Sequence, residues 1–140
     1  KELLDFASRF EVRLGLENRY HLFDIPTQDE MAALLSLSEP DRLGFVYDVG
    51  HAMAMDRLGF FPNEMWLKRF GGRILGAHLH DAIGISDHYA PGLGEVDFRM
   101  VAGYLPKDSF RTMEVMSINT PEQIKTGLKI LVDTGCVNLI

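Results

Sequence analysis

Four residues whose side chains can bind a metal ion recur along the chain at nearly regular intervals. Glu17, Asp48, His78 and Glu114 are separated by 31, 30 and 36 residues, and each stands at the end of a short apolar run. One strand–loop–helix–loop unit needs about thirty residues or more, so the intervals predict one such unit between neighbours. Because parallel strands bring their carboxyl ends to one rim, we expect the four side chains to converge there.

This combination of side chains predicts a divalent metal site. Two or three carboxylates with an imidazole suit Mn²⁺, Mg²⁺, Co²⁺ or Zn²⁺ and leave coordination positions for substrate oxygens. The set contains no thiolate, which favours Mn²⁺ or Mg²⁺ over a structural zinc.

Each of these residues also has an ordinary structural interpretation. Arg19 is close enough in sequence to pair with Glu17, and Asp48 is well placed to cap the following turn. A histidine such as His51 is, taken alone, more often structural than catalytic. The occurrence of all four residues at matched strand ends nevertheless favours the metal site.

The richest stretch runs from 74 to 98 and supplies further polar side chains. His78, His80 and Asp81 lie within four positions, and Asp87 and His88 follow six residues later. His78 and His80 alternate with Leu79, so we expect both to point to the same side of a strand. Two histidines on one buried face are costly unless they are paired or ligated.

The elements that position these residues follow from apolar runs and helix signals. Capping boxes begin helices at Thr27 with Glu30 and at Thr120 with Gln123, and Asp97 is expected to cap a third helix. Strands are predicted at 12–16, 43–47, 74–79 and 110–115, and helices at 1–10, 26–37, 62–70, 98–105 and 121–134. We expect residues 49–61 to be a connection, 80–97 a loop, and 137–140 a short apolar tail.

This alternation predicts the fold class. An N-terminal helix followed by four strand–helix units indicates an α/β protein with parallel strands and right-handed crossovers. We expect residues 1–140 to form a single domain.

Composition limits the classes of function. The 140 residues are 46% apolar with a net charge of −6, which argues weakly against a broad nucleic-acid-binding surface. The single Cys136 excludes an internal disulfide framework, so a reducing, cytoplasmic setting is expected. No apolar run is long enough to span a bilayer, and the first ten residues do not resemble a secretion signal. Because the first residue is Lys1, we expect the chain to be part of a longer protein.

The motifs of the chain resemble those of a known family. LGLEN, YDVGHA, HLHD, DHYAPGLGEVDF and TMEVM occur in the order found in the C-terminal half of the xylose-isomerase-like TIM-barrel superfamily. That superfamily contains sugar-phosphate isomerases, ketose 3-epimerases and endonuclease-IV-type abasic-site nucleases. The resemblance implies half of an eight-stranded barrel, with four of its eight strand–helix units.

The resemblance also implies roles for the site residues. Glu17, Asp48, His78 and Glu114 correspond to the four metal ligands, and Glu17 and Glu114 to the groups that move the proton on either side of a sugar carbon. His51 corresponds to a histidine that contacts substrate or a further metal, and His80 is an alternative ligand. Asp81, Asp87 and His88 are further candidates for contacts with substrate or a second metal.

The leading hypothesis is therefore a metal-dependent isomerase or epimerase of a small sugar or sugar phosphate, acting through an enediolate. An abasic-site phosphodiesterase is the second hypothesis. The nuclease pattern has Asp-x-His, whereas Asp87 and His88 are adjacent, so we expect their side chains to turn differently. A third hypothesis is a non-catalytic half-barrel. Its open sheet edges need to be covered, so we expect a dimer or higher homo-oligomer that could close an eight-stranded barrel.

Overall fold

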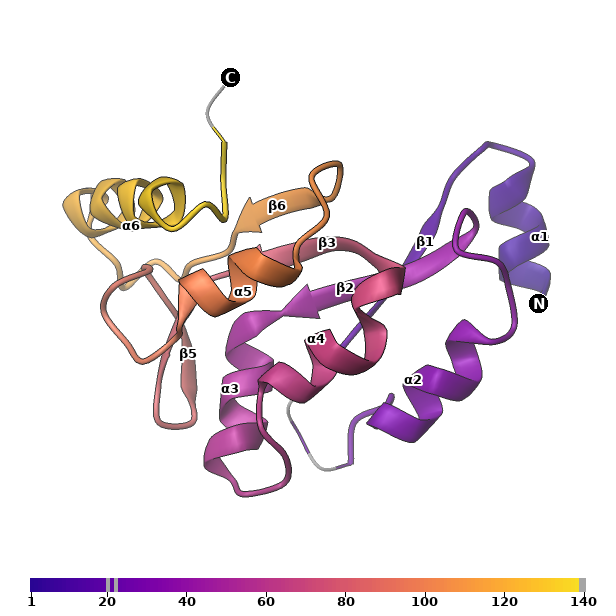
Figure 1. The fold of residues 1–140 in the computed structure, drawn as a ribbon, viewed down its shortest axis with the longest axis horizontal. Helices are drawn as coiled ribbons and strands as arrows, with labels where there is room; N and C mark the ends of the chain where they lie inside the picture. Colours follow the sequence, from indigo (N-terminus) through magenta and orange to yellow (C-terminus); the bar gives the residue numbers. More distant parts are fainter. Residues whose placement is uncertain (20, 22, 139–140) are drawn as a thin grey trace.

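A computed structural model of the protein describes residues 1–19, 21 and 23–138. Helical segments alternate with the strands of the main sheet along the chain, and the element at each end is a helix (Figure 1). The elements are α1 Glu2–Ser8, β1 Leu14–Glu17, α2 Gln28–Leu35, β2 Leu43–Asp48, α3 Val49–Arg57, α4 Glu64–Phe70, the 3₁₀ turn η1 Gly71–Arg73, β3 Ile74–Leu79, β4 Asp81–Ile83, β5 Ser86–Tyr89, α5 Phe98–Tyr104, β6 Phe110–Met113 and α6 Pro121–Asp133. None of the described helices is long and apolar enough to cross a membrane.

The main sheet is parallel and its strands lie in chain order. The order is β1-β2-β3-β6, and each new strand is added on the same side of the previous one. This order is that of a barrel wall, whereas a doubly wound sheet reverses its direction once. The predicted α/β class with four parallel strand–helix units is confirmed, and the sheet is a partial barrel.

The core lies between the sheet and the helices that cover one of its faces. Phe45 and Tyr47 on β2 are fully buried there, and Trp66 on α4 stacks on Phe45 with ring centroids 5.9 Å apart. Figure 1 shows α1 and α6 at opposite ends of the molecule, with α4 and α5 between them. Burial of these large side chains is the main source of stability.

The opposite face of the sheet is thinly covered. Gly44 on β2 lies beneath Leu75, whose Cγ would be only 2.3 Å from a Cβ at position 44. The side chain of Phe110 on β6 is 46% exposed, and among the described strands β1 and β6 each pair on one side only. This arrangement is consistent with half of a barrel whose interior face and two edges lack the other half.

Residues 49–61 form more regular structure than expected. The prediction of a connection was wrong, because Val49–Arg57 is the helix α3 and its first seven residues are buried. The Asp48 side chain accepts a hydrogen bond from the His51 backbone N–H and so starts the helix directly at the strand end. Ala and Met then favour its continuation.

The expected loop at 80–97 also contains regular structure. β4 and β5 form an antiparallel two-stranded hairpin, with Asp81 opposite Tyr89 and Ile83 opposite Ser86. The hairpin packs against α3, which is why its short strands are ordered outside the main sheet.

Helix starts and ends are closer to expectation. Both capping boxes, at Thr27 and Thr120, are present, and Asp97 accepts hydrogen bonds from the backbone N–H groups of Arg99 and Met100. The fourth strand ends at Met113, so Glu114 lies just beyond β6. Residues 139 and 140 of the expected apolar tail lie outside the described residues.

We expect Thr120→Ala to lower the free energy of unfolding by about 1 kcal/mol, because the α6 capping box loses its side-chain acceptor. Thr126→Ala is the matched control, since Thr126 is an exposed residue within the same helix and alanine is a better helix former. Urea unfolding followed by far-UV circular dichroism measures both. Equal destabilisation by the two substitutions would contradict this account of the cap.

Candidate functional site

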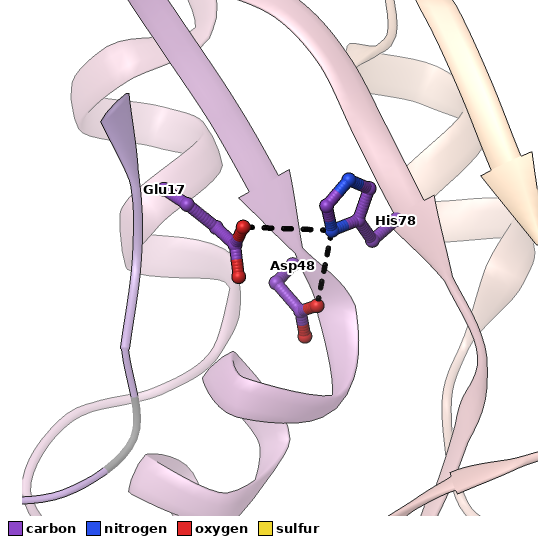
Figure 2. Close-up of side chains that lie close together, drawn as sticks. All are labelled: Glu17, Asp48 and His78. Carbon is purple, nitrogen blue, oxygen red and sulfur yellow. Dashed lines mark ion pairs between the residues drawn. The ribbon is translucent and has the colours of Figure 1, made fainter. Parts of the chain in front are cut away.

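Three of the four predicted ligands meet at the ends of neighbouring strands. Glu17 is the last residue of β1, Asp48 the last of β2, and His78 pairs with Asp48 in the β2–β3 register. Nδ1 of His78 lies 3.6 Å from Oε2 of Glu17 and 3.6 Å from Oδ2 of Asp48 (Figure 2). One ligand atom from each of the three residues lies within 4.8 Å of the others.

Glu114 contacts the same ring nitrogen of His78. Its Oε2 lies 2.9 Å from Nδ1 of His78, and its Oε1 lies 3.6 Å from Nε2 of His88. Its side chain is 44% exposed, and it is not in the compact group of three. Three carboxylates from three strands therefore face one nitrogen.

That nitrogen is itself unusual. Nδ1 of His78 is buried, yet among the described residues it makes no hydrogen bond of acceptable geometry. The nearby Asp48 carboxylate is the main cause that raises the pKa of His78, and Glu17 and Glu114 add to it against the opposing effect of burial. A buried ring nitrogen surrounded by carboxylate oxygens is the arrangement that a bound cation satisfies.

Asp48 is fully buried and anchors the cluster. Its Oδ1 caps α3 by accepting from His51 N at 2.8 Å, and both of its carboxylate oxygens lie 3.0–3.1 Å from Nε2 of His80. Burial alone would raise the pKa of Asp48, but the imidazoles of His78, His80 and His51 together hold it well below its usual value. The same carboxylate therefore both caps α3 and contacts the imidazoles of the site.

Asn18 is a part of the site that sequence reasoning missed. Its side chain is fully buried and pairs twice with the Asp48 backbone: Nδ2 donates to Asp48 O at 2.9 Å, and Oδ1 accepts from Asp48 N at 2.8 Å. The only signal in the sequence is an amide directly after the strand-end Glu17. This pair fixes the exit of β1 against the exit of β2.

His51 lies beside the cluster on the first turn of α3. Its Nδ1 is 2.9 Å from the Asn18 carbonyl oxygen, which only accepts, so Nδ1 carries a proton. The same nitrogen lies 3.3 Å from Glu17, and Nε2 lies 3.8 Å from Oδ2 of Asp87. Burial lowers the pKa of His51, but Glu17, Asp48 and the Asn18 carbonyl outweigh it and raise that pKa.

His80 is completely buried and uses both of its ring nitrogens. Nε2 contacts Asp48, and Nδ1 accepts a hydrogen bond from the backbone N–H of His88 at 2.9 Å. His78 and His80 thus both contact the Asp48 carboxylate, as expected for side chains on the same side.

Asp87 and His88 lie together on β5, and their side chains contact each other although they occupy adjacent positions. His88 has a backbone φ of +63°, and its Nδ1 lies 2.8 Å from Oδ1 of Asp87. This left-handed conformation brings the imidazole back to the side of its neighbour.

Asp81 lies away from this group. Its carboxylate accepts backbone hydrogen bonds from Ala82, Gly92 and Val96 at 2.8–3.0 Å and so holds the loop after the hairpin. These contacts indicate a structural role for Asp81.

A cleft of about 460 Å³ opens over the cluster. Its lining comes from the ends of β1 and β6, from α3 and from β5, and consists of Glu17, Arg19, His51, Asp87, His88, Glu114 and Met116. Arg19 pairs with Glu17 at 3.7 Å and with Asp24 at 3.9 Å, so its charge is already shared between two carboxylates.

Solved structures resemble this fold, among them those of two named proteins. A D-tagatose 3-epimerase-like protein superposes with a TM-score of 0.76 and 20% identity, over 95% of this chain and 50% of its own. The IolI protein with a binding zinc atom gives a TM-score of 0.70 and 24% identity, over 96% of this chain and 52% of its own. The chain thus spans about half the length of each structure, and at these identities the likeness shows the fold alone.

No curated protein sequence matches the chain. A family match, in contrast, covers residues 1–134 and is described as a xylose isomerase-like TIM barrel. This match agrees with the strand order and with the half-barrel architecture. The chain therefore belongs to the xylose isomerase-like TIM-barrel family.

Proposed function

We propose that Glu17, Asp48, His78 and Glu114 hold a divalent cation, and that the chain is the metal-binding half of an isomerase or epimerase acting on a small sugar. The observation that carries this proposal is the buried Nδ1 of His78, which faces carboxylates from three other strand ends at 2.9–3.6 Å. The carboxylates raise the pKa of His78, but its Nδ1 makes no hydrogen bond of acceptable geometry among the described residues, so a bound cation would give this nitrogen a partner.

The spacing of the donor atoms supports a metal. Metal–ligand distances of about 2.0–2.2 Å place neighbouring ligands of a tetrahedral ion roughly 3.3–3.6 Å apart. The separations of 3.6 Å from His78 to Glu17 and to Asp48 agree with that range. Glu114 is 44% exposed, so rotation about its side-chain bonds can complete the set.

The donor set also limits the identity of the cation. Oxygen-rich ligands suit Mn²⁺ and Mg²⁺, while one imidazole among carboxylates also suits Co²⁺ and Zn²⁺. The zinc in the IolI structure supports Zn²⁺ as a candidate for this chain.

The reaction class follows from which groups border the cleft. Glu17 comes from one outer strand and Glu114 from the other, so a substrate in the cleft meets a carboxylate from each side. One carboxylate accepts the proton from a carbon next to a carbonyl, and the other, in its protonated form, returns a proton to the enediolate. The bound cation supplies Lewis-acid polarisation of the carbonyl and hydroxyl oxygens.

His51 has a supporting role in this proposal. Its Nδ1–H is directed at the Asn18 carbonyl, which leaves Nε2 on the side of the cleft and of Asp87. From there Nε2 is within reach of a substrate hydroxyl, where it orients the sugar.

The substrate class rests on this acidic cleft and on the epimerase-like fold neighbour. A small sugar fits both, and the net charge of −6 argues weakly against nucleic acid. A sugar phosphate is the less favoured alternative, because Arg19 in the cleft lining already pairs with Glu17 and Asp24. A homo-oligomer that covers the free edges of β1 and β6, and a cytoplasmic location, remain predictions.

Metal binding is the first test. We expect one Mn²⁺, Co²⁺ or Zn²⁺ per chain in isothermal titration calorimetry. His78→Gln and Glu114→Gln each remove a proposed ligand. Each should weaken metal binding by more than the roughly 10- to 100-fold that is typical of losing a residue that contacts only a ligand. Glu122→Gln, an exposed carboxylate in the first turn of α6, is the matched control and should bind like the wild type. No binding by the wild type, or equal binding by all variants, would remove the basis of the proposal.

The raised pKa values predict a pH dependence of the metal-free protein. A histidine whose pKa is raised by folding contributes stability that is fully present below its ordinary pKa of 6.5 and is lost as the pH rises through the raised value. We therefore expect the free energy of unfolding to fall as the pH rises above 6.5, and to fall less in His78→Gln. An unchanged slope in that variant would show that the carboxylates do not stabilise the protonated imidazole.

Catalysis is tested by proton exchange with solvent. With the cation bound, the chain should incorporate deuterium at the carbon beside the carbonyl of a small ketose in D₂O, observed by proton NMR. Loss of either proposed proton-transfer group, Glu17 or Glu114, should lower the rate by about 10²- to 10⁴-fold. Cleavage of an abasic duplex without exchange in sugars would favour the nuclease hypothesis, and neither activity with metal bound would favour the non-catalytic one.

A further inference from the structure

We propose that His80 is a positioning residue that holds two parts of the site together: the Asp48 carboxylate and the backbone of β5 at His88. This inference deepens the proposed function and rests on it for its metal-binding consequence. It assigns His80 a role other than the alternative metal ligand expected from the sequence.

The hydrogen bonds determine which nitrogen of His80 carries the proton. Nδ1 lies 2.9 Å from the backbone nitrogen of His88, and a backbone N–H can only donate, so Nδ1 accepts. The proton of the neutral ring is therefore on Nε2, which lies 3.0 and 3.1 Å from the two oxygens of Asp48. His80 thus donates to the carboxylate through one nitrogen and accepts from the hairpin through the other.

The surroundings of the ring hold it in this orientation. His80 is completely buried, and its ring stacks on that of His88 with centroids 4.2 Å apart and planes inclined by 12°. Gly50 also lies against the ring, and an added Cβ there would come within 2.1 Å of Cε1 of His80. The start of α3 therefore lacks a side chain at the position that the imidazole occupies.

Both connections matter for the proposed metal site. A carboxylate ligand that accepts an outer hydrogen bond keeps its remaining lone pairs directed at the ion. The same imidazole anchors His88, whose left-handed φ of +63° is unfavourable for a residue with a side chain. His80 thus fixes a ligand on β2 relative to the groups of β5 that line the cleft.

Two substitutions separate the two halves of the role. A glutamine amide nitrogen reaches about the place of Nε2, so His80→Gln keeps the donor to Asp48. An asparagine amide reaches only about the place of Nδ1, so His80→Asn keeps an acceptor for His88 N–H and loses the donor. Thermal unfolding identifies a temperature at which both variants are folded. The titrations are carried out at that temperature.

The readouts are calorimetric affinity for Co²⁺ and the visible absorption spectrum of the Co²⁺-loaded chain. We expect His80→Asn to bind about 10- to 100-fold more weakly and to change the spectrum, and His80→Gln to stay within about tenfold of the wild type with its spectrum retained. His21→Gln, which removes an imidazole that pairs with Asp24 outside the cluster, is the control and should match the wild type. Equal losses in the two His80 variants, or none in His80→Asn, would overturn the proposal.

A second readout needs no metal. In the metal-free wild type, nitrogen-15 chemical shifts of His80 should show a protonated Nε2 and an unprotonated, hydrogen-bonded Nδ1. The opposite tautomer would overturn the role of His80 even if metal binds. If the wild type binds no cation while this tautomer is found, the proposed function fails and the connection between Asp48 and His88 stands.

Discussion

The fold around the site depends on one buried charge, the carboxylate of Asp48 at the end of β2. Removing a carboxylate from water is costly unless it is paired and hydrogen-bonded. Asp48 meets that requirement with the first turn of α3 and with the imidazole of His80. Asn18 holds its backbone from β1. The exits of three neighbouring strands and the start of one helix are therefore arranged around a single side chain, and the same charge makes the place suitable for a cation.

Features encoded by local sequence were the ones that could be predicted. The capping boxes at Thr27 and Thr120 need only residues three positions apart, and both form as expected. α3 could not be predicted because its N-cap, Asp48, is also the last residue of β2. No loop residues separate the strand from the helix, so the sequence carries no separate signal for a helix start. The β4–β5 hairpin is too short for a periodic pattern and is ordered by packing against α3, which is information that lies outside its own residues.

In the site, too, the residues that could be predicted are those marked by sequence spacing, and the missed ones are those whose role comes from tertiary contacts. Regular spacing was sufficient to predict that Glu17, Asp48 and His78 lie close together, because parallel strands repeat their geometry. Asn18 was missed because its importance comes from two hydrogen bonds to a backbone thirty residues away. The contact between Asp87 and His88 could not be predicted, because it accompanies a left-handed backbone conformation at His88 that the sequence does not indicate.

The side chain of Leu75 links positions 44 and 75 on neighbouring strands. It extends from β3 across the glycine of β2, on the face of the sheet that also carries the acidic cluster, and fills the space in which position 44 would otherwise place a side chain. An apolar side chain therefore lies on this face, nearer the amino ends of β2 and β3 than the charged groups. Substitutions at positions 44 and 75 are therefore coupled, since a larger residue at position 44 requires a smaller residue at position 75.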